Sequence, residues 1–230
     1  MQHQDTDKLN ILLEKLHLNS VDFNSLFDEI ADTLMNYYSV KTIKGNFRIT
    51  ELEFYIYAPG HEDIYTNIHD CNIGSGYWEF VAQIDEKELD KTRFKGIHIN
   101  LGNGNEICGG ILVCGLVKLG DPKLKSKGAK DTVELILNHI NDDYKSFEVM
   151  NLMNGGIGFD KGLIELVQTD FKADKKECKR ERRAISESVN SITQLQLKPL
   201  GNEPITDLEK METKVNFYKD LLYKYVLSSN

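Results

Sequence analysis

The sequence Phe-Arg-Ile-Thr-Glu-Leu-Glu-Phe-Tyr-Ile-Tyr at residues 47–57 predicts the central strand of this fold. Apolar, β-branched and aromatic residues dominate it, and successive side chains of a strand point to opposite faces of a sheet. One face is mostly apolar and suits a hydrophobic core. Its residues are Arg48, Thr50, Leu52, Phe54 and Ile56. The residues of the other face are Phe47, Ile49, Glu51, Glu53, Tyr55 and Tyr57.

The second face has two interpretations. Carboxylates beside aromatic rings are what a site needs to stack a flat ligand and act on it as a base. The same pattern fits a half-exposed strand in which Glu51 and Glu53 lie in water. The strand by itself leaves both interpretations open.

The composition favours one domain over residues 1–230, of which residues 1–20 could be a loosely attached N-terminal segment. Hydrophobic residues make up 40% of the chain, which is enough for a core. The net charge of −8 disfavours indiscriminate binding of nucleic acid, because phosphate contacts need local lysine and arginine. A basic patch on an acidic protein remains compatible with this charge.

Hydrophobic periodicity predicts helices over about 7–17, 22–37 and 131–141. A capping box at Thr206 and Glu209 predicts a further C-terminal helix, whose apolar face extends to Tyr225. Strands are expected near 47–57, 77–81, 96–102, 109–117 and 163–167, and residues 118–130 are expected to form a linker. The predicted fold class is α+β, a mixed and mostly antiparallel sheet flanked by N- and C-terminal helices.

The four cysteines are scattered and form no C-x-x-C motif, which predicts neither a zinc site nor a disulfide framework. They are Cys71, Cys108, Cys114 and Cys178. The histidines of the polar segment 60–76 lack the spacing of metal ligands, so we expect no metal and no cofactor. No apolar run approaches the roughly 18 residues that a membrane span needs. We therefore expect a soluble cytoplasmic protein with reduced thiols and no membrane contact.

The run Arg-Ile-Thr-Glu-Leu-Glu-Phe-Tyr at residues 48–55 resembles the active-site strand of the methylpurine (3-methyladenine) DNA glycosylases. That family has a strand of the form Ile-Val-Glu-Thr-Glu-Ala-Tyr between a helical region and a polar loop with a histidine. The order of elements here is similar over roughly residues 20–120. The resemblance implies a monofunctional hydrolase that removes a damaged or modified purine from DNA after base flipping.

The resemblance also assigns roles to residues. Glu53 corresponds to the catalytic acid that deprotonates a water, Tyr55 to the aromatic residue that stacks on the extruded base, and His69 to the loop histidine. Three neighbours are further candidates for substrate binding: Glu51, Tyr57 and His98. The basic run 172–183 is the candidate for phosphate contact, and its strongest candidates are Lys179, Arg180, Arg182 and Arg183.

Two departures favour an alternative. Cys114 stands where the family carries an arginine near the end of its apolar strand, and the chain is acidic where these enzymes present a basic face to DNA. The alternative is a catalytically inactive nucleotide- or protein-binding domain on the same scaffold.

Overall fold

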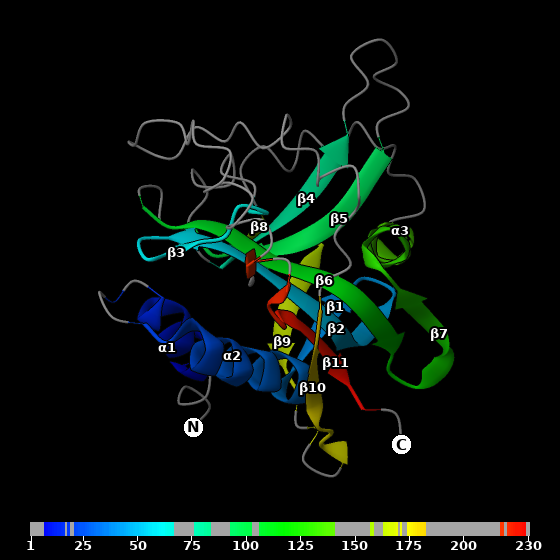
Figure 1. The fold of residues 1–230 in the computed structure, drawn as a ribbon. Helices are drawn as coiled ribbons and strands as arrows, with labels where there is room; N and C mark the ends of the chain where they lie inside the picture. Colours follow the sequence, from blue (N-terminus) through cyan, green and yellow to red (C-terminus); the bar gives the residue numbers. More distant parts are fainter. Residues whose placement is uncertain are drawn as a thin grey trace.

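The computed structural model describes residues 7–16, 18, 21–66, 76–83, 93–102, 106–140, 157–158, 163–169, 171, 174–182, 217–218 and 220–228. These residues form an α+β domain with eleven strands in one curled sheet and three longer helices (Figure 1). Every pairing between described strands is antiparallel. The predicted fold class is confirmed.

The sheet follows the order β10-β11-β2-β6-β5-β4-β8, and β1, β3, β7 and β9 pair outside this path. Its first strands are β1 (Tyr38–Thr42), β2 (Gly45–Ala58), β3 (His61–Glu62), β4 (Tyr77–Gln83), β5 (Arg93–Asn100) and β6 (Cys108–Lys118). The remaining strands are β7 (Asp121–Lys127), β8 (Ile157–Gly158), β9 (Ile164–Gln168), β10 (Cys178–Glu181) and β11 (Lys224–Leu227).

The predicted central strand, β2, packs against two helices. Phe54 stacks on Phe27 of α2 (Phe23–Tyr37), with ring centroids 4.4 Å apart. Phe47 meets His139 of α3 (Ala129–Ile140), with centroids 4.9 Å apart.

A β-bulge interrupts the predicted alternation of β2, where the pairing with β6 shifts register around Thr50 and Glu51. A Cβ at Gly115 of β6 would contact both Thr50 and Glu51, so these two neighbours lie on one face. The predicted placement of Phe47 and Ile49 on the face of Glu51 is therefore wrong, and both belong to the core with Leu52, Phe54 and Ile56.

The helix α1 (Asp7–Lys15) packs beside α2, and the leucines of residues 9–16 belong to the same core. The start of the chain is thus part of the domain from residue 7 onward, rather than a loosely attached segment. Among the described residues, no helix has the length and apolar character needed to cross a bilayer.

Two predictions about secondary structure are wrong. Lys224 to Leu227 form strand β11 between β2 and β10, where the apolar periodicity predicted the end of a C-terminal helix. Cross-strand pairing outweighs helix periodicity there. The capping box at Thr206 and Glu209 lies outside the described residues. Asp121 to Lys127, predicted as linker, form strand β7, because β6 continues through a tight turn and pairs with it.

The expectation that all thiols are reduced is also wrong. Cys108, at the start of β6, is disulfide-bonded. Cys114 and Cys178 are free. Cysteine spacing alone carried no signal for this bond, because a single disulfide requires only that two side chains meet in the folded chain.

Candidate acid-base site

The two carboxylates of β2 are buried. Glu51 is 7% exposed and Glu53 is 5% exposed. The interpretation of a half-exposed strand with both carboxylates in water is therefore wrong. Burial of two carboxylates is costly unless nearby groups compensate their charge.

Lys224 of β11 supplies this compensation. Its Cα pairs with that of Glu53 across the two strands, and its Nζ lies 2.6 Å from Glu51 Oε1 and 3.9 Å from Glu53 Oε1. Burial alone would lower the pKa of Lys224, but the hydrogen bond to Glu51 and both carboxylate charges raise the pKa above its usual value. The ammonium group is thus held in its charged form between the carboxylates.

Tyr55 orients the second carboxylate. Its hydroxyl donates a hydrogen bond of 2.7 Å to Glu53 Oε2, which places the ring beside the carboxylate on the same face of β2. Within the described part of the chain, the contact of Glu53 Oε1 is the longer one of 3.9 Å with Lys224. One oxygen of Glu53 is therefore fixed by Tyr55, while the other is held less closely.

Cys114 completes this cluster from β6. One ligand atom each of Glu51, Glu53 and Cys114 lie within 4.8 Å of one another, an arrangement that could hold a metal ion. Lys224 compensates one of the two carboxylate charges through its contact with Glu51. Burial above all, with the carboxylate charges, raises the pKa of the Cys114 thiol far above its usual range, so the sulfur stays protonated.

A row of side chains crosses the sheet on this face. The strand registers align His98 of β5 with Leu112 of β6, Leu112 with Glu53, and Glu53 with Lys224. Cross-strand neighbours lie on the same face. On the far side of His98, its partner on β4 is Glu79. Glu53 and His98 thus share one face, with one strand between them.

Gly110 is closely packed beside this row. It pairs with Tyr55 on one side and Asn100 on the other. A Cβ at this position would lie 2.9 Å from the Ile99 carbonyl oxygen and 3.4 Å from His98 Nδ1, so a larger residue would crowd the imidazole. The absence of a side chain at Gly110 therefore lets His98 pack closely against β6.

The polar groups beside Gly110 are held in defined states. Burial lowers the pKa of His98 to about 4, so the ring is neutral, and its buried Nδ1 has no hydrogen-bond partner among the described residues. Asn100 donates to Glu79 Oε2 at 3.0 Å. Burial raises the pKa of Glu79, although this hydrogen bond opposes the shift. A neutral imidazole and an amide suit a flat, hydrogen-bonding ligand.

We expect His98 to make the protein less stable as the pH falls from about 6.5 towards 4. The unfolded imidazole takes up a proton near pH 6.5 while the folded one stays neutral, so up to about 3 kcal/mol of unfolding free energy is lost across this window. Urea unfolding at several pH values checks this. Replacing His98 by Gln should flatten the slope. Glu79, whose raised pKa acts in the opposite direction, is present in both proteins, so an unchanged slope would contradict the assignment.

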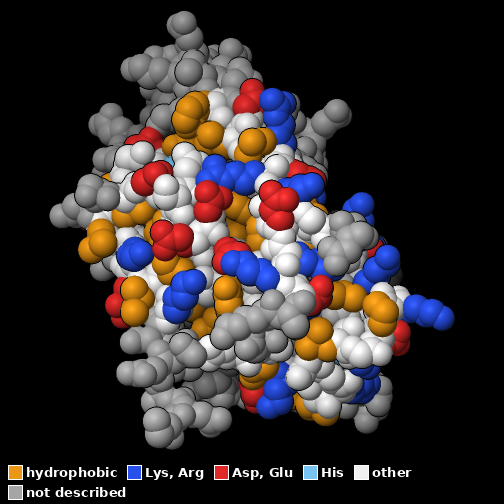
Figure 2. Space-filling view, turned by 90° about the horizontal axis from the view of Figure 1, so that it is seen from below, with side chains coloured by type: hydrophobic (Ala, Val, Ile, Leu, Met, Phe, Trp, Pro, Cys, Tyr) orange, Lys and Arg blue, Asp and Glu red, His pale blue; other side chains and the backbone are white. Residues whose placement is uncertain are grey.

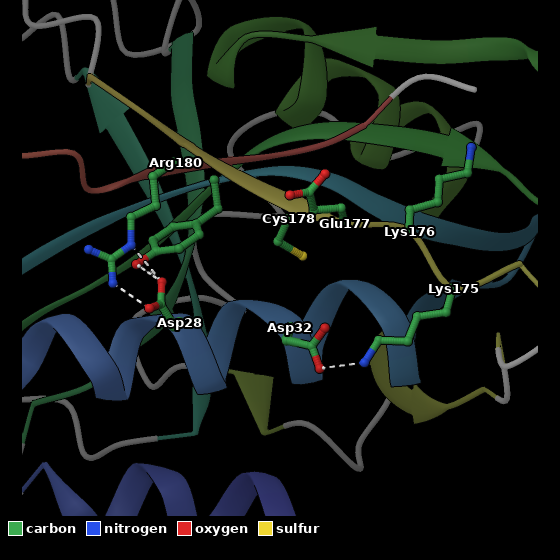
Figure 3. A pocket seen from close by; sticks show the side chains of 8 residues that line it. Asp28, Asp32, Lys175, Lys176, Glu177, Cys178 and Arg180 are labelled. Carbon is green, nitrogen blue, oxygen red and sulfur yellow. Dashed lines mark hydrogen bonds and ion pairs between the residues drawn. The ribbon is translucent and has the colours of Figure 1, made fainter.

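The basic run does not join this site as predicted. Arg180 reaches from β10 to α2, where its Nε donates to Asp28 Oδ1 at 2.6 Å, and Lys175 meets Asp32 at 3.3 Å further along the helix (Figure 3). Tyr225, the cross-strand partner of Arg180, also bonds Asp28. Arg180 therefore lies on the α2 face of the sheet, opposite Glu51 and Glu53.

The other predicted residues have mixed outcomes. Tyr57 is half-buried opposite Glu62, and burial followed by the charge of Glu62 raises its pKa. Arg182 pairs with Asp220 on the surface at 3.2 Å. Lys179 is exposed on β10. His69 and Arg183 lie outside the described residues, so their predicted roles stay predictions.

Sequence reasoning missed Lys224, the residue that balances the buried carboxylates. It lay inside the predicted C-terminal helix. The pattern Lys224-Tyr225-Val226-Leu227 alternates in the structure, with Tyr225 and Leu227 buried, and this period of two was the available signal.

Fold and site together define an α+β protein with a curled antiparallel sheet, a salt-bridged carboxylate pair on one strand and a buried histidine on the same face. Comparisons with models of known protein families, with curated proteins and with solved structures found no match.

Proposed function

We propose that this protein binds a purine-like heterocycle on the carboxylate face of the sheet and hydrolyses its N-glycosidic bond, with Glu53 as the general base. The observation that carries the proposal is the row that places His98 and Glu53, the latter bonded by Tyr55, on one face of the sheet. The resemblance of residues 48–55 to the methylpurine DNA glycosylases supports the choice of bond and of a modified purine in DNA.

In this mechanism the oxygen Oε1 of Glu53 accepts a proton from a water molecule. The water attacks the sugar carbon as the bond to the base breaks, and the base leaves with the bonding electrons. Tyr55 holds Oε2 and so orients the carboxylate. His98, neutral at working pH, offers Nδ1 to the flat ring.

Replacing Glu53 by Gln tests the proposal. We expect the rate of base release to fall about a hundredfold or more, because an amide cannot take the proton from water. The measurement is release of free base from labelled duplexes that carry alkylated or deaminated purines. Glu51→Gln is the matched control, since it removes an equal charge from the same strand.

The outcome separates chemistry from structure. Equal loss of activity in the Glu51 and Glu53 variants, accompanied by a lower melting temperature in both, would assign the pair a structural role. No base release by the unmodified protein from any duplex of the panel would contradict glycosidic hydrolysis outright.

A second candidate function is binding without catalysis, as the alternative above holds. The specific observation in its favour is Lys224, whose ammonium pairs with Glu51 at 2.6 Å and lies 3.9 Å from Glu53, an arrangement that also fits a structural role of the carboxylates. The buried Cys114 supplies no charge to place a water. In this case Glu53→Gln would leave ligand affinity unchanged and no turnover would be found.

A further inference from the structure

A groove of about 610 Å³ opens where β7 and the end of β11 flank the start of β2. Four of its lining residues are lysines: Lys118, Lys125, Lys127 and Lys176. We call this feature the lysine groove. Lys125 aligns through Val117 with Arg48, and Lys127 aligns through Gly115 with Glu51. The groove thus lies on the face of β2 that, because of the bulge, carries both Arg48 and Glu51.

The positive charge of the lysine groove is not balanced locally. Its two carboxylates are already neutralised, because Asp174 pairs with Arg48 at 2.8 Å and Glu51 pairs with Lys224 at 2.6 Å. Within the described part of the chain, none of the four lysine ammonium groups forms an ion pair. A concentration of unpaired cations in a chain of net charge −8 needs an anionic partner to be favourable.

The distribution of charged side chains on the surface agrees with an unbalanced positive charge in the lysine groove. Over the middle of the face seen in Figure 2, basic and acidic side chains are interspersed, and several Lys and Arg side chains project at its right-hand edge. The strand β7 lies on that side of the molecule in Figure 1. Its three lysines, at positions 123, 125 and 127, are exposed.

The arrangement of these lysines indicates the shape of the partner. Lys125 and Lys127 pair with β6 two positions apart, so they share one face about 6.6 Å from each other. Cations spread along a groove in this way fit a chain of regularly spaced negative charges better than one compact anion. Phe171, an aromatic residue of the groove, covers Arg48 with its ring and is buried, so it offers no exposed surface for stacking.

We propose that the lysine groove binds the phosphodiester backbone of a nucleic-acid strand, without reading its bases. The inference rests on the proposed function for the choice of nucleic acid among polyanions. Glu51 belongs both to the groove and to the carboxylate cluster, so a strand held in the groove would lie next to the candidate centre. Arg48 is not a ligand, since its donors already bind the protein.

The test is fluorescence anisotropy of a short labelled single-stranded oligonucleotide over a series of salt concentrations. The variant Lys125→Gln/Lys127→Gln removes two groove charges. The control Lys15→Gln/Lys130→Gln removes the same charge from α1 and α3. Each phosphate contact to a single strand contributes about 0.7 to the slope of log affinity against log salt, so the groove variant should lose about 1.4 of that slope. The control should lose almost none.

The proposal would be overturned if the groove and control variants bound the oligonucleotide equally well. Binding of phosphatidylserine vesicles without binding of the oligonucleotide would also overturn it. Lys118→Gln/Lys176→Gln provides a second groove variant should the first fail to fold. Full competition by inorganic phosphate at low concentration would indicate a compact anion site and would also contradict a strand. Glu53→Gln should bind the oligonucleotide normally, so a failure of catalysis and a failure of binding remain distinguishable.

Discussion

Replacing Arg48 by Met is expected to lower the free energy of unfolding by about 3–5 kcal/mol. The side chain is 4% exposed. Its Nε donates to the Met35 carbonyl at 3.1 Å, and one Nη donates to Asn36 Oδ1 at 2.8 Å. Methionine fills much of the volume but leaves these buried acceptors with fewer donors, and an unmet buried polar group is more costly than a lost bond. Chemical denaturation with urea measures the change.

The salt bridge to Asp174 is not the source of this effect. The Asp174 side chain is 60% exposed, and an exposed partner contributes little. Asp174→Asn is therefore the control, with an expected loss below about 1 kcal/mol. If Asp174→Asn proved as destabilising as Arg48→Met, the contribution would come from the ion pair and not from the bonds to Met35 and Asn36.

Replacing Lys224 by Met is expected to cost a similar amount, about 3–5 kcal/mol at neutral pH, because Glu51 and Glu53 would stay buried without a cation. Part of the loss should return on acidification. Protonation would remove the uncompensated charge of the two buried carboxylates. Thermal unfolding at several pH values measures both effects.

A second substitution makes the test specific. Adding Glu51→Gln to Lys224→Met removes the carboxylate that Lys224 contacts at 2.6 Å, so the double variant should be more stable than Lys224→Met alone. If the two changes simply added, Lys224 would be stabilising the strand pairing of β11 and not the buried charge.

Local pattern was sufficient to predict much of the fold. The amphipathic periodicity of α2 and the buried apolar run of β6 appear as helix and strand within a residue or two of the predicted bounds. Both patterns are strong because each segment buries a face in the same core, and burial is what hydrophobic periodicity records. The alternation of β2 from Glu51 onward, and with it the shared face of Glu51 and Glu53, also follows from the sequence alone, whereas the bulge at Thr50 does not.

Contacts between distant segments explain what the pattern could not predict. Whether Glu53 contacts water or a lysine depends on β11, which lies about 170 residues further along the chain. The pairing of Glu53 with Lys224 of β11 shows this dependence. The same holds for Arg180, whose place opposite the carboxylates depends on the pairing of β10 with β11. Helix periodicity near the C-terminus was overruled because an open edge of β2 offered backbone hydrogen bonds to an incoming strand.

The sequence by itself thus establishes that Glu51, Glu53 and Tyr55 share one face of β2, since a regular strand alternates its side chains. Only the tertiary structure brings Lys224 to these carboxylates and aligns His98 with Glu53. It also turns the lysines of a predicted linker into one wall of a groove. The physical reason is that charge compensation and strand order depend on which segments come into contact in the folded chain. The distance between two residues along the sequence does not reveal such a contact.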